Sequence, residues 1–194
     1  MRNLVRWIVQ LGLALGYGCI AVAVAFAQSA PVAEVGADYN YVRTNAPPNG
    51  CGCFSMNGGN AWFAYNFTHS LAVVAEISNQ RASDIGGSGE DFTLTSYLFG
   101  PRFSWRKSWH LAPFGQVLLG GAHAGGSLPQ DSFSASSNSF ALIAGGGLDI
   151  GITRHLALRA LEADYYRTQF PNGLNDRQNN LRLGAGVIFR FGER

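Results

Sequence analysis

The sequence has 194 residues, of which 25 are glycine, 12% are aromatic and only 13% are charged. This length suits one domain with one closed core. Arg2 and Arg6 fall in an apolar leader, so basic and acidic residues balance in the rest of the chain, which does not indicate a nucleic-acid partner. Beyond the leader no apolar run reaches the roughly 18 residues of a membrane helix, so the apolar content indicates strands.

Residues 1–27 are predicted to be a signal peptide, which leaves 28–194 as one exported domain. A positively charged start precedes a long apolar stretch, and the Ala-Phe-Ala of 25–27 provides small residues before the cleavage point. The length of the apolar stretch leaves an uncleaved helical anchor as an alternative. Acylation at Cys19 is a second alternative, although Gly16 stands where a lipoprotein signal carries a bulky aliphatic residue.

Two cysteines remain after the leader, Cys51 and Cys53, in a segment rich in Pro, Gly and Asn. A disulfide across one intervening residue is strained, but an oxidising compartment permits it. Two thiols with no histidine nearby make only half of a tetrahedral metal site. We therefore leave open a loop disulfide or two unpaired thiols, and we expect no metal and no cofactor.

Alternation of apolar and polar residues predicts eight strands, because side chains of a strand point to opposite faces in turn. In residues 181–191 every odd position is apolar, whereas Arg182 and Arg190 lie among the even positions. Two segments are less regular: Leu94 and Leu98 fall on the polar side of the fourth strand, and the fifth strand is apolar on both faces, so its facing is not assigned. The predicted strands are 33–43, 60–67, 71–80, 92–105, 111–123, 140–150, 156–168 and 181–191.

The predicted connections alternate in length. Long ones are expected at 44–56, 79–91, 124–139 and 168–180, and short ones at 68–70, 106–110 and 152–155. Membrane barrels have this asymmetry, with short periplasmic turns and longer links outside. Aromatic residues also gather towards strand ends, where interfacial girdles would lie: Tyr39, Tyr41, Tyr65, Phe67, Trp105, Trp109, Tyr165, Tyr166, Phe189 and Phe191. The prediction is an all-β, eight-stranded, antiparallel, up-and-down transmembrane β-barrel in the cell outer membrane.

Several short motifs carry a family resemblance: AYNF at 64–67, FGPR at 99–102, GGGLD at 145–149, ADY at 163–165 and GVIFRF at 186–191. In this order and spacing the chain resembles the outer membrane protein β-barrel domain family, relatives of the OmpA membrane domain, over residues 32–192. The resemblance implies outer-membrane lipid and the barrel-assembly machinery as partners, because the closing strand ends in an aromatic residue, Phe191, although three residues follow it. It does not identify an external partner.

Charged residues fall on the faces that the alternation assigns to the barrel interior. A barrel of eight strands is narrow enough for side chains to fill, and buried carboxylates need partners. We therefore predict a structural network of paired charges, not a catalytic pair or an ion pathway. Arg159 does not fit the alternation, and we interpret it as a β-bulge or as a side chain that reaches the periplasmic interface. The predicted network comprises Glu34, Asp38, Glu76, Arg102, Asp149, Glu162, Asp164, Arg182 and Arg190.

Three functions remain open. The first, which we predict, is a non-enzymatic barrel with a structural envelope role or with links that bind a partner or mediate adhesion. The second is a lipid-modifying enzyme, since some outer-membrane barrels use Ser and His, but no Ser–His–acid set is evident and three of the four histidines fall in predicted short turns. The third is a secreted soluble lipocalin-like barrel that binds a ligand in an apolar interior. The histidines considered are His69 (next to Ser70), His110, His123 and His155.

Overall fold

The computed structural model describes residues 30–45, 54–83, 85, 91–106, 108, 110–127, 134–170 and 176–193. The leader, Cys51 and Cys53 lie outside these residues. Eight strands form: β1 (Pro31–Arg43), β2 (Ser55–Asn66), β3 (Leu71–Ala82), β4 (Asp91–Ser104), β5 (Leu111–Ser127), β6 (Ser134–Gly151), β7 (Leu156–Thr168) and β8 (Gln178–Glu193).

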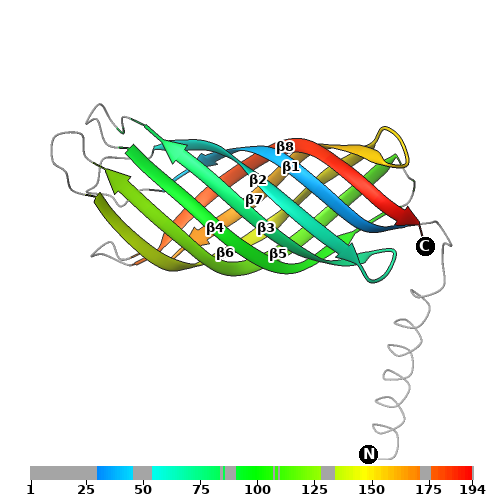
Figure 1. Cartoon of the computed structure of the whole chain (residues 1–194), viewed down its shortest axis with the longest axis horizontal. Helices are drawn as coiled ribbons and strands as arrows, with labels where there is room; N and C mark the ends of the chain where they lie inside the picture. Colours follow the sequence, from blue (N-terminus) through cyan, green and yellow to red (C-terminus); the bar gives the residue numbers. More distant parts are fainter. Residues whose placement is uncertain are drawn as a thin grey trace, which may run out of the picture.

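Each strand pairs antiparallel with its neighbours in the sequence, and β8 pairs with β1, so the sheet closes into a barrel. Figure 1 shows a long cylinder of tilted strands with β1 and β8 side by side. The end where β1 begins and β8 ends is called the inner end here, and the opposite one the outer end. The predicted fold class, an eight-stranded antiparallel barrel, is confirmed.

The outer wall of the barrel is apolar. On β1, Val35 is 40% exposed, whereas its neighbours Glu34 and Gly36 face inwards. Large apolar side chains are exposed on every strand, and they include Phe63, Val73, Phe99, Val117, Phe140, Leu158, Val187 and Phe189. A soluble lipocalin-like barrel would place its apolar faces inside, so that alternative is wrong. Among the described residues, no helix is long and apolar enough to cross a membrane.

The two irregular strands of the sequence take clear facings. On β5, Leu118 is fully buried, whereas Val117 and Leu119 are more than 40% exposed. Leu94 and Leu98 of β4 also point inwards, at 2% and 3% exposure. Both strands look apolar on two faces because one part of the barrel interior is itself apolar.

The predicted alternation of link lengths is only partly right. Strands β5 and β6 run further than expected, so that Ser127 pairs with Ser134 and the link shrinks to 128–133. This link is no longer than 105–110 on the inner end. The sequence at the outer ends of both strands is polar, like that of a loop. A strand segment that extends beyond the lipid needs no apolar face, so alternation of apolar and polar residues does not mark it.

A β-bulge interrupts β7. The register with β6 shifts between Leu148 and Asp149, and the register with β8 shifts between Arg159 and Glu162. Arg159 consequently points into the barrel with 1% exposure. The interpretation of Arg159 as a bulge marker is confirmed, and its alternative placement at the interface is wrong. Tyr166, predicted for the girdle, also faces inwards and is fully buried.

Candidate functional site

The barrel interior is the candidate site, because it gathers a large set of buried charged residues. All nine residues of the predicted network lie there, each at most 7% exposed: Glu34, Asp38, Glu76, Arg102, Asp149, Glu162, Asp164, Arg182 and Arg190. Two further arginines join them that sequence reasoning did not include, Arg106 and Arg159. The set is therefore six carboxylates and five guanidinium groups.

Arg182 on β8 lies at the centre of one cluster. Its Nη1 and Nη2 donate to the two carboxylate oxygens of Glu76 on β3, across the barrel. Its Nε and Nη2 donate to Asp164 Oδ2 on β7 at 2.9 and 2.8 Å. Its Nη2 also lies 3.0 Å from Glu162 Oε1. One buried guanidinium thus holds three carboxylates, with the forked geometry that suits arginine.

Arg159 forms a second cluster, which the bulge in β7 makes available. Its Nε donates to Asp149 Oδ1 at 3.0 Å, and its Nη1 to Glu162 Oε2 at 2.6 Å and Asp38 Oδ2 at 3.3 Å. Glu162 therefore bonds both Arg159 and Arg182. This shared carboxylate joins the two clusters into one network.

A third cluster fills the inner end. Arg190 Nε donates to Glu34 Oε1 at 3.1 Å, as the pairing of β1 with β8 places these residues opposite each other. Arg106, which follows β4, reaches the other oxygen of Glu34 at 2.7 Å and also bonds the backbone oxygen of His69 at 2.9 Å. Even positions of β4 face inwards, so continuing that alternation past Ser104 would have predicted Arg106.

Arg102 makes no ion pair with a carboxylate of the described residues and is held differently. Its Nε and Nη2 donate to Gln116 Oε1 at 3.0 and 2.8 Å. Its guanidinium carbon lies 4.2 Å from the ring centroid of Trp62 and 4.8 Å from that of Phe114. Arg159 lies 4.4 Å from each of the same rings, so two aromatic side chains separate two like charges and interact favourably with both.

Trp62 fits in the interior because the facing residue on β1 is glycine. Gly36 pairs with Trp62, and a Cβ on Gly36 would lie 2.3 Å from the indole ring. The indole nitrogen donates to Asp38 Oδ2 at 2.7 Å, so the ring position is tied to the network.

Gly36→Ala should therefore destabilise the barrel by about 1–3 kcal/mol, the usual effect of overpacking. Gly115→Ala is the matched control, because a Cβ there meets only Gly145 O at 3.7 Å; we expect a change within about 0.5 kcal/mol. Urea unfolding in phospholipid vesicles measures both. Equal effects of the two substitutions would contradict this account of Gly36.

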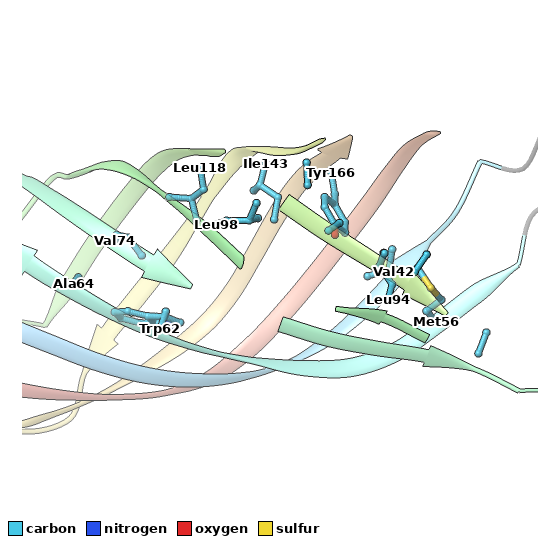
Figure 2. Close-up of a cluster of buried hydrophobic side chains, with 14 of the residues drawn as sticks. Val42, Met56, Trp62, Ala64, Val74, Leu94, Leu98, Leu118, Ile143 and Tyr166 are labelled. Atoms are coloured by element: carbon cyan, nitrogen blue, oxygen red, sulfur yellow. The ribbon is translucent and has the colours of Figure 1, made fainter. Parts of the chain in front are cut away.

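The interior also contains apolar side chains towards the outer end. Val42 and Met56 pair across β1 and β2, and Figure 2 shows them together with Leu94 at one end of the buried cluster. The rings of Phe54 and Phe92 pack against this cluster with their centroids 5.9 Å apart, edge to face. Buried apolar side chains are thus present along the barrel, and near the outer end they lie beside uncharged polar side chains such as Gln80 and Asn180.

Two of the histidines considered in the sequence make contacts that the structure describes. No group of three or more His, Cys, Asp or Glu among them could hold a metal ion. His69 Nε2 bonds the backbone oxygen of Arg106 at 2.9 Å, and His123 Nδ1 bonds Asn138 Oδ1 at 2.8 Å. Neither contact joins a histidine to a serine or a carboxylate, as a nucleophilic site would require.

Comparison with known proteins gives a consistent result. The sequence matches the outer membrane protein β-barrel domain family over residues 12–189. The fold is similar to Neisserial surface protein A (TM-score 0.64, 16% identity, 84% of this chain and 99% of that one). It is also similar to OprG of Pseudomonas aeruginosa (0.55, 14%, 84% and 97%) and to Ail, the attachment invasion locus protein of Yersinia pestis (0.51, 22%, 80% and 98%). A search of curated proteins finds no match. The chain belongs to the outer membrane protein β-barrel domain family and is a protein of the bacterial outer membrane.

Proposed function

We propose that this protein is a non-enzymatic scaffold of the outer membrane, whose filled barrel holds four links on the cell surface. The observation that carries the proposal is the interior, where buried ion pairs join strands across the bore and a cluster of apolar side chains is also buried. Such a bore leaves the links and the outer wall as the surfaces available to a partner.

The outer ends of the strands support this proposal. Above the apolar wall, exposed polar side chains pair between neighbouring strands, for example Asn79 with Thr95 at 2.8 Å and His123 with Asn138 at 2.8 Å. Polar pairs are favourable in water and unfavourable in lipid, so the barrel wall extends beyond the membrane and supports the links there.

The links also restrict the chemistry of a partner. In sequence, the segments 44–54, 83–90, 128–133 and 169–177 contain four acidic residues and a single basic one, Arg177. They are otherwise rich in Gly, Asn, Pro and Ser. A strongly anionic partner would be repelled, so we propose that the links bind a neutral or cationic surface or serve only as connections.

Orientation is tested with the two cysteines. Because the barrel has an even number of strands, both chain ends lie on one side, and we expect the links to face outwards. A membrane-impermeant maleimide should label Cys51 and Cys53 in mildly reduced intact cells, and Cys→Ser variants should abolish the label. Labelling only after lysis, with other surface epitopes accessible, would overturn the orientation.

The non-enzymatic role is tested by lipid analysis. Cells with and without the protein should show the same lipid A mass spectrum and the same phospholipid profile. A gained or lost acyl chain or headgroup that depends on the protein would favour the lipid-modifying alternative and overturn the proposal.

A further inference from the structure

Two arginines on the outer wall flank β8 near its outer end. In the register, Arg43 of β1 pairs with Leu181, and Arg167 of β7 pairs with Asn179. β1 and β7 are the two neighbours of β8. Because adjacent strands are separated by about 5 Å, the axes of β1 and β7 are about 10 Å apart. Arginine side chains are long enough for both guanidinium groups to approach one anion above β8.

The height of this pair on the wall matches the edge of the lipid. Just below the arginines the exposed residues are aromatic or apolar: Tyr41 at 39%, Tyr165 at 46% and Leu181 at 49% exposure. Tyrosine is typical of the membrane–water interface, with its ring in the lipid and its hydroxyl group outside. The arginines therefore lie where the phosphate groups of lipids are found.

The charges of both arginines are not neutralised by the described part of the protein. Arg43 Nη1 donates to a neutral acceptor, Ser55 Oγ, at 3.1 Å. Arg167 has no ion pair with a described residue, and its buried Nε has no hydrogen-bond partner there. By contrast, Arg81, at a similar height on β3, pairs with Asp91 at 2.6 Å.

We propose that Arg43 and Arg167 bind a phosphate group of an outer-leaflet lipid, whose acyl chains lie on the wall beside Tyr41, Tyr165 and Leu181. Guanidinium groups bind phosphate through two parallel hydrogen bonds, and the wall below supplies contact for hydrocarbon. This site goes beyond the scaffold role but depends on the proposed orientation, which the maleimide labelling tests separately.

Native mass spectrometry of the folded full-length protein in detergent, titrated with lipid A that carries two phosphates, tests the site. We expect Arg43→Gln/Arg167→Gln to weaken lipid A binding about tenfold or more, because hydrogen bonds between charged groups contribute more to affinity than those between neutral groups. Arg81→Gln should bind lipid A as the wild type does. Chemically dephosphorylated lipid A should bind the wild type as weakly as intact lipid A binds the double variant. Heat-modifiability on a gel confirms that each variant is folded.

Four results would overturn the proposal. Equal binding by the wild type and the double variant would show that these arginines do not hold the lipid. An equal loss in Arg81→Gln would show a general effect of charge. Equal binding of dephosphorylated lipid A would show that only the apolar wall is used. A protein dimer that disappears in the double variant, without any change in lipid binding, would assign this face to a second copy of the chain instead.

Discussion

Arg182→Met should destabilise the barrel by about 3–5 kcal/mol, the largest effect that we expect from a single substitution. Arg182 contacts Glu76, Glu162 and Asp164, and all three carboxylates are at most 4% exposed. Methionine keeps much of the side-chain volume but leaves three buried carboxylates without this partner. The free energy of unfolding, measured with urea in phospholipid vesicles, gives the effect.

Arg81→Met is the matched control, since Arg81 also has a close ion pair, with Asp91 at 2.6 Å, but is 61% exposed. Exposed pairs contribute at most about 1 kcal/mol. Adding Glu76→Gln to Arg182→Met should restore part of the lost stability, because it removes one of the unpaired charges. Similar effects of Arg182→Met and Arg81→Met would contradict the interpretation of the interior as a coupled network.

The position of Arg182 in the network also predicts a ranking. Arg190→Ala should have a smaller effect, because Glu34 keeps its contact with Arg106 at 2.7 Å. Glu76 forms an ion pair with Arg182 and with no second arginine of the described residues. The two substitutions should therefore differ in effect because Glu34 has a second arginine partner, and not because the two arginines differ in burial.

Val187→Arg should destabilise the barrel by about 2–4 kcal/mol, because a charged side chain on the lipid face near the middle of the membrane must lose its hydration. Val187 is 40% exposed on β8, between Leu181 and Phe191, which are also exposed. The same residue in a soluble protein would tolerate this change, since exposed positions usually do. Urea unfolding in phospholipid vesicles again measures the effect.

Asn179→Arg is the control on the same strand and the same face. Asn179 lies beyond the apolar wall, where its side chain accepts a hydrogen bond from Tyr165 at 2.5 Å. Near the interface an arginine costs about 0–1 kcal/mol. A penalty for Asn179→Arg as large as that for Val187→Arg would mean that the lipid boundary lies elsewhere on the barrel.

The strand pattern could be read from the sequence because lipid imposes it. An outward residue in the membrane must be apolar, so the alternation in β8 from Leu181 to Phe191 is regular and its facing was predicted correctly. No comparable rule acts inside the barrel. There both polar and apolar side chains fill space, as Arg102 and Leu118 do. Because the inward residues of β5 are apolar as well, the sequence did not show which face of β5 points into the barrel.

The composition of the network was less predictable than its existence. The bulge in β7 reverses the alternation by one residue, so Arg159 seemed to face lipid although it binds three carboxylates. Arg106 lies beyond the end of β4, where a turn was expected. Which carboxylate each arginine binds depends on contacts across the bore, such as Arg182 with Glu76, and these follow from the closed register and not from local sequence.

Conductance in a planar lipid bilayer tests most directly the claim that side chains fill the bore. The wild-type protein, folded and inserted as a monomer, should leave the current at the baseline of the bare bilayer at either polarity of the applied voltage. Insertion is verified in the same preparation by heat-modifiability and by protection from protease. Steady, stepwise currents of uniform size from the inserted wild-type monomer would show a continuous water path and contradict the filled interior.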